Sequence, residues 1–94
     1  MYYINLKGGV VMEKHCIGVI GIVDKKPRET TAKVNDIISS YRDIVIGRMG
    51  IPRHDNNVGL ISVIVEGDAE KINAFETELK KIDGLIVSMA LSIC

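Results

Sequence analysis

Residues 58–93, VGLISVIVEGDAEKINAFETELKKIDGLIVSMALSI, decide the fold because they place a strand, a helix and a second strand in immediate succession. The run 58–66 is rich in β-branched residues, which predicts a strand. Asp68 is a favourable N-cap, and Gly84 is a plausible end of the helix that follows. Residues 85–93 alternate like a strand with two distinct faces. The apolar residues at helical spacing in between are Ile72, Phe75, Leu79 and Ile82.

The preceding half of the chain has a similar pattern. Residues 15–23, HCIGVIGIV, are a nearly continuous apolar run, which predicts a buried central strand. Residues 28–41 carry an apolar stripe at helical spacing and predict a helix. Residues 43–49 predict a second strand, and turn-forming residues follow it. Since only a loop separates this strand from the strand at 58–66, we expect an antiparallel hairpin.

The resulting order is strand, helix, strand, strand, helix, strand. Because β-α-β crossovers are right-handed, both helices lie on one face of a four-stranded antiparallel sheet. We therefore predict an α+β fold of the ferredoxin-like βαββαβ type. The other face carries no helix and presents small and apolar residues, in one register or in the opposite register of the same strands. The first register exposes Gly18, Ile20, Ile22, Leu60, Ser62, Ile64, Ser88 and Ala90.

Such an apolar sheet face is rarely left in water, so we expect a homo-oligomer that buries it through the sheet. The composition agrees, because 47% of the 94 residues are hydrophobic and the mean hydropathy is +0.20. A domain of this size has only a limited core of its own. Residues 1–11 read as an N-terminal extension, disordered or forming an extra strand, and residues 12–94 as the folded domain.

Charge and composition argue against several classes of partner. The formal net charge is zero and aromatic residues make up only 4%, so we expect no direct nucleic-acid binding. No apolar run is long enough to cross a membrane, and the N-terminal residues do not resemble a signal peptide. We therefore expect a cytoplasmic protein with no membrane partner.

The reactive side chains form no recognised catalytic or metal-binding motif. Without a nucleophile–base pair, a metal-ligand repeat or a phosphate-binding loop, we predict neither an enzyme nor a bound cofactor. His15 and Cys16 are neighbours in a strand and point to opposite faces, while His54 and Cys94 are distant in sequence. We therefore predict no metal site within the chain, although a site assembled between subunits is an alternative.

Two groups of residues are candidates for a ligand site or an interface. Gly18 and Gly21 lie inside an apolar strand, where they allow either close packing, which we favour, or room for a ligand or another chain. Between residues 46 and 55, Arg48 and Arg53 bracket a Gly-containing turn whose amides could bind an anion or a carboxylate. The competing interpretation is a bulged hairpin with solvated tips. The candidates in this segment are Arg48, Met49, Gly50, Arg53 and His54.

Three stretches carry a family resemblance: IGVIGIV at 17–23, IVIGRMGIP at 44–52 and the run at 59–92, with GRMGIP and SMALS as the most specific parts. They resemble the iron-only hydrogenase system regulators, which are ACT-like domains similar to the ligand-binding domain of nickel-responsive CopG-type repressors. The resemblance implies that residues 12–94 are an ACT-like regulatory domain that self-associates through sheets and responds to a small ligand. The 11 additional residues are too short for a ribbon-helix-helix segment, and the Cys and His positions do not match a nickel ligand set.

We therefore predict a homo-oligomeric domain that senses an unidentified small-molecule ligand and regulates an iron-only hydrogenase system. Two alternatives stay open at this point. One is a transition-metal sensor or carrier that serves metallocluster assembly. The other is a structural module that docks on an enzyme.

Overall fold

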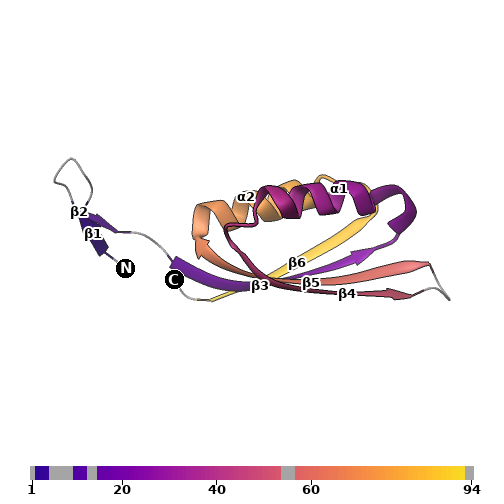
Figure 1. Ribbon diagram of the computed structural model, residues 1–94, viewed down its shortest axis with the longest axis horizontal. Coiled ribbons are helices and arrows are strands. Elements are labelled where there is room, and N and C mark those ends of the chain that lie inside the picture. Colours follow the sequence, from indigo (N-terminus) through magenta and orange to yellow (C-terminus); the bar gives the residue numbers. More distant parts are fainter. Residues whose placement is uncertain (1, 5–9, 13–14, 54–56, 93–94) are drawn as a thin grey trace.

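The computed structural model describes residues 2–4, 10–12, 15–53 and 57–92. Its main body is a four-stranded antiparallel sheet with strand order β4-β5-β3-β6, covered on one side by two helices (Figure 1). The strands are β3 (His15–Asp24), β4 (Val45–Arg53), β5 (Val58–Asp68) and β6 (Leu85–Leu91), and the helices are α1 (Pro27–Ser40) and α2 (Ala69–Lys80). The predicted ferredoxin-like order of strands and helices is confirmed.

The N-terminal extension contains two further short strands. β1 (Tyr2–Ile4) pairs antiparallel with β2 (Val10–Met12) in a sheet of their own. Figure 1 shows this pair beyond the start of β3, away from the two helices.

The hydrophobic core lies between the helices and the sheet. The apolar stripe of each helix faces the sheet, as the spacing predicts, and Phe75 stacks on Tyr41 with ring centroids 4.9 Å apart. The buried apolar residues are Cys16, Ile20, Ile22, Val34, Ile38, Ile44, Val63, Val65, Ile72, Phe75 and Leu79.

β3 adopts the second of the two predicted registers, in which the odd-numbered residues face away from the helices. Burial alternates along this strand, and Gly18, Ile20 and Ile22 lie under the helices instead of on the uncovered face. Both sets of alternating residues are apolar, so hydrophobicity alone does not fix the register. Asp24 favours the observed one, because its carboxylate accepts hydrogen bonds from the Lys26 backbone N–H and the Thr30 hydroxyl at the start of α1. It must therefore face the helices.

The turn predicted after residue 49 is wrong, because the chain stays extended through Arg53, which pairs with Val58. Pro52 is tolerated here since β4 is an edge strand, where a missing N–H donor leaves no partner unpaired. The predicted helix at the second crossover also ends early. α2 stops at Lys80, and Gly84, with φ of 99°, lies in the left-handed turn that leads into β6.

Candidate functional site

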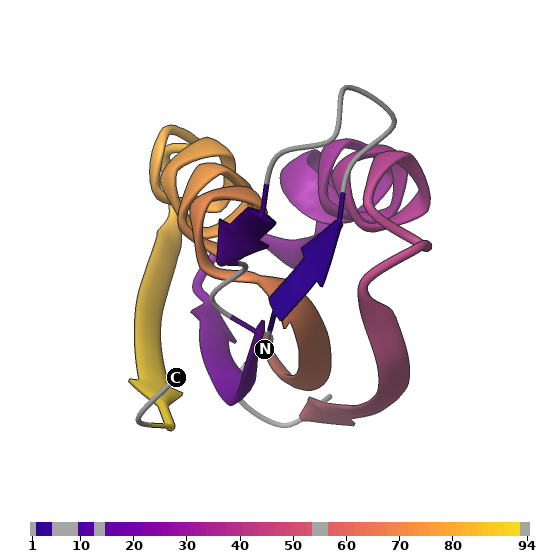
Figure 2. The same cartoon turned by 90° about the vertical axis from the view of Figure 1, so that its left-hand side faces the viewer.

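The uncovered side of the sheet, called the open face below, carries a continuous set of exposed apolar side chains. No helix or strand within residues 15–53 and 57–92 covers it (Figures 1 and 2). The exposed fractions range from 37% for Val23 to 63% for Met49. The strand registers place these side chains on one surface: Ile17, Val19, Val23, Met49, Ile51, Ile64 and Ile86.

A row of small residues crosses the middle of the open face. Gly21 of β3 lies opposite Ser62 of β5 on one side and Ser88 of β6 on the other. Because these side chains are short, the larger apolar residues around them enclose a shallow hollow of about 270 Å³. It is lined by Gly21, Val23, Met49, Ile51, Leu60 and Ser62. The Ser62 hydroxyl is the side-chain polar group of this set, so the hollow suits an apolar group with one hydrogen-bonding atom.

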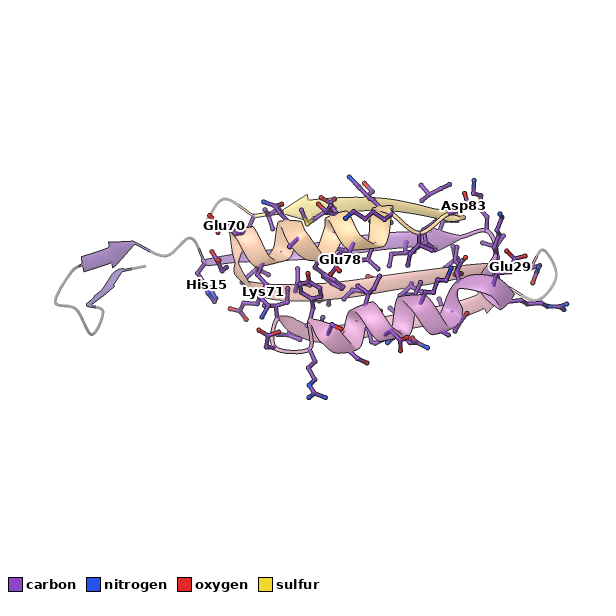
Figure 3. All side chains as sticks on the ribbon, turned by 90° about the horizontal axis from the view of Figure 1, so that it is seen from above. His15, Glu29, Glu70, Lys71, Glu78 and Asp83 are labelled. Carbon is purple, nitrogen blue, oxygen red and sulfur yellow. The ribbon has the colours of Figure 1, made fainter. Side chains whose placement is uncertain are left out.

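Charged groups lie at one end of the open face. His15 Nε2 is 3.0 Å from Glu66 Oε2, and each side chain is more than one third exposed. The interaction joins β3 to β5 at the end of the sheet where β3 begins, and Figure 3 shows His15 at this end of the molecule. At this end the open face is therefore bordered by polar groups.

The structure brings together only some of the predicted site residues. Met49 and Gly21 both line the hollow. Arg48 points toward the helix layer, where its Nη2 donates to Asn35 Oδ1 over 3.0 Å. Gly50 pairs with Ile61, which packs against the core, so it lies on the side opposite Met49. Arg53 is the last residue of β4, and His54 lies outside the described residues.

Gly18 lies on the helix-covered side, where space is short. A Cβ atom at this position would be 2.9 Å from Leu91 Cδ1 and 3.0 Å from the Ala90 carbonyl oxygen. At Gly21 the nearest atom would be the Ser88 carbonyl oxygen at 4.0 Å. Gly18 is therefore needed for close packing of β3 against β6, whereas Gly21 leaves room on the open face.

A second concave surface lies between the two helices. This groove of about 560 Å³ is bordered by both helices and by the turn after α2. Figure 3 shows Lys71 and Glu78 on the side of α2 that faces α1. The Glu78 carboxylate accepts a hydrogen bond from Tyr41 and raises the pKa of that phenol. The groove carries side chains of both charges, which is typical of a solvated surface. It is lined by Lys33, Asp36, Ile37, Glu78, Lys81, Ile82 and Asp83.

Two exposed ion pairs join segments that are distant in sequence. Lys26 Nζ lies 2.9 Å from Asp83 Oδ2, which raises the pKa of Lys26 and lowers the pKa of Asp83. Lys71 donates to Asp43 and lowers the pKa of that carboxyl. The short contact between the charged groups of each ion pair accounts for the pKa shifts. Because both ion pairs are exposed to solvent, they contribute little to the stability of the fold.

Within the described part of the chain, no three His, Cys, Asp or Glu side chains come together as a metal ion would require. The one buried carboxylate there, Asp24, is engaged with the start of α1. Among the same residues, no helix has the length and apolarity needed to span a membrane.

The residues named from the sequence for the open face did not include its three large apolar residues on β3, Ile17, Val19 and Val23. The signal that identifies them is Asp24. Asp24 stands two residues before Lys26, at the start of the helix that begins with Pro27. An Asp side chain in such a position typically accepts a hydrogen bond from the backbone N–H two residues later. This orients Asp24 toward the helix and leaves the odd-numbered residues of β3 on the other face.

Comparison with known proteins supports the fold. The structure is similar to "The structure of uncharacterized protein TM1266 from Thermotoga maritima", with a TM-score of 0.78 and 20% identity over 83% of this chain and 98% of that chain. It is also similar to the de novo designed protein Foldit4, with a TM-score of 0.54 and 16% identity over 84% of this chain and 97% of that one. At these identities the likeness shows a shared fold alone.

A search of curated proteins finds no match. A family model does match residues 16–89, which span most of the main body. Its description is "TM1266-like: Iron-only hydrogenase system regulator, putative". The chain therefore belongs to the TM1266-like family, whose name suggests a regulator of an iron-only hydrogenase system.

Proposed function

We propose that this protein is a non-catalytic regulatory domain that self-associates through the open face and senses a small ligand held there. The observation that carries the proposal is the continuous apolar surface on β3, β4, β5 and β6, with exposed fractions of 44% at Val19, 50% at Ile17 and 53% at Ile86. Large contiguous apolar surfaces on soluble domains mark interaction sites. The family description suggests which system is regulated, namely an iron-only hydrogenase system.

The hollow at the centre of the open face suggests how a ligand acts. On one copy it is shallow, and its volume of about 270 Å³ is near the lower end for small-molecule sites. A second copy packed on the open face would close the hollow and bury a ligand between the two. A ligand that binds only this closed state stabilises the oligomer by mass action. The ligand would be a small, mainly apolar molecule with one hydrogen-bonding group for Ser62.

Thermal unfolding with two sets of probes tests this proposal. We expect small apolar alcohols such as cyclohexanol to raise the melting temperature, and nucleotides to leave it unchanged. Gly21→Ala is the matched control, because the added Cβ meets no neighbour closer than 4.0 Å and points into the hollow. The rise should disappear in this variant. An equal rise in both proteins would place the ligand elsewhere, and a monomeric mass with no response to any probe would contradict the proposal.

A further inference from the structure

The two edges of the sheet differ in how they are protected against pairing with another strand. β4 is one edge and β6 is the other, on opposite sides of the sheet (Figure 2). β4 has a register shift between Val45 and Gly47 and contains Pro52 and two arginines. Bulges, prolines and charged residues are the features that prevent edge-to-edge association. β6, with sequence LIVSMAL, has no charge and no proline and pairs with β3 without a register shift.

Two backbone hydrogen bonds at the ends of the β3–β6 pair show which groups of β6 point outward. The Ser92 N–H donates to the Ile17 carbonyl and the Lys25 N–H donates to the Gly84 carbonyl, each over 2.8 Å. Residues of an antiparallel ladder alternate between bonding to one neighbour and facing away from it. The even-numbered residues of β6 therefore bond to β3. The odd-numbered residues direct their N–H and C=O groups away from β3, and no strand within the described residues pairs with them. The Leu85 N–H is the exception, because it donates to the Ile82 carbonyl in the turn before β6.

We propose that β6 pairs antiparallel with β6 of a second copy, around a two-fold axis at Ser88, to form one eight-stranded sheet. Full overlap of the seven-residue strand fixes this register. It places Leu85 opposite Leu91 and Val87 opposite Met89. These pairs would form about six backbone hydrogen bonds, because the Leu85 N–H of each copy already donates to the Ile82 carbonyl. The register also places Ile86 opposite Ala90, a large residue against a small one.

The choice of a second copy as the occupant rests on this symmetry. Ser88 is the middle residue of β6, and each side of it consists of three apolar residues that end in a leucine: Leu-Ile-Val before it and Met-Ala-Leu after it. A two-fold interface requires such self-complementarity, because each residue meets its counterpart on the same surface of the other copy. A foreign strand would need no such pattern. This lateral contact is separate from the stacking of open faces, so it goes beyond the function proposed above.

Disulfide trapping at Ser88 tests the pairing. In the proposed register Ser88 faces Ser88 of the second copy in a non-hydrogen-bonded pair, with Cα atoms about 4.5 Å apart. This lies within the range of a disulfide, roughly 4.4–6.8 Å. Ser88→Cys should therefore give a covalent dimer under mild oxidation that a reductant reverses. Ala90→Cys, the matched control on the same strand and face, should not, because its counterpart is displaced by four residues.

Peptide mass mapping identifies which cysteines form the disulfide in the covalent dimer. The unsubstituted protein, oxidised in the same way, shows the products that the native cysteines form by themselves. Stacked open faces would not give the same product, since packed sheets lie about 10 Å apart, beyond disulfide reach. Absence of the 88–88 product in a folded Ser88→Cys protein, or equal trapping at position 90, would overturn the edge pairing. If the native protein then still self-associates, only the edge pairing fails and the open-face proposal stands.

Discussion

Alanine substitution at two glycines of one strand tests the assignment of the two sheet faces. At Gly18 the new Cβ would lie 3.0 Å from the Ala90 carbonyl oxygen and 2.9 Å from Leu91 Cδ1. Leu91 can rotate, but the carbonyl cannot move without disturbing the pairing of β3 with β6. Overpacking of this kind costs about 1–3 kcal/mol. Replacing glycine inside a strand returns about 0.5–1 kcal/mol. We therefore expect Gly18→Ala to lower the free energy of unfolding by up to about 2.5 kcal/mol.

Gly21→Ala should behave in the opposite way. The nearest atom to its Cβ would be 4.0 Å away, which is ordinary contact, so only the gain of about 0.5–1 kcal/mol remains. Urea denaturation at several protein concentrations measures both variants and separates folding from self-association. Equal stability of the two variants, or a larger loss at Gly21, would refute the assignment of Gly18 to the packed face.

Three further predictions concern the core and the charged groups. Phe75→Ala should lower the free energy of unfolding by about 3–5 kcal/mol, because Phe75 is fully buried and stacked on Tyr41; a loss below about 1 kcal/mol in chemical denaturation would contradict the helix register. Thr30→Val removes the hydroxyl that donates to the buried Asp24 carboxylate and should cost about 1–3 kcal/mol in the same assay, whereas Thr31→Val, at an exposed position, should cost less. Lysine partners hold the pKa of Asp43 and Asp83 below the ordinary 3.8, so their contribution is present above that value and is lost as the pH falls through the lowered pKa. Thermal unfolding in the acid range should therefore depend less on pH in the double variant Asp43→Asn, Asp83→Asn, and an unchanged slope would contradict the role of these pairs.

The sequence was sufficient for the order of the elements because each has its own periodicity. The helical stripe of α2 and the alternation of β6 differ in period, and periodicity distinguishes a helix from a strand reliably. The limits of α2 were less accurate, since Ile82 keeps helical spacing although the helix ends at Lys80. Ile82 lies in the turn after α2 and still packs against the core. A residue can therefore contact the core at helical spacing without being part of the helix.

The candidate site was harder to predict because it depends on contacts between strands. The run 17–23 is apolar at nearly every position, so its pattern fits either face. The glycine, proline and arginine content of 46–53 indicated a turn, yet pairing with β5 holds it extended. Local composition does not report such tertiary pairing. Met49 and Gly21, both candidates from the sequence, line the hollow, whereas the other lining residues could be assigned only from the register.

Sedimentation equilibrium of a charged open-face variant tests the central claim most directly. Val19 and Ile64 lie directly opposite each other at the centre of the open face. Val19→Lys with Ile64→Glu keeps the net charge at zero and places opposite charges side by side, which an antiparallel pair tolerates. The matched control, Ala32→Glu with Ser39→Lys, places the same charges on exposed positions of α1. We predict that the native protein and the control self-associate at micromolar concentration, and that the open-face variant stays folded but loses this interface and has a lower mass. Equal masses for all three proteins would contradict self-association through the open face.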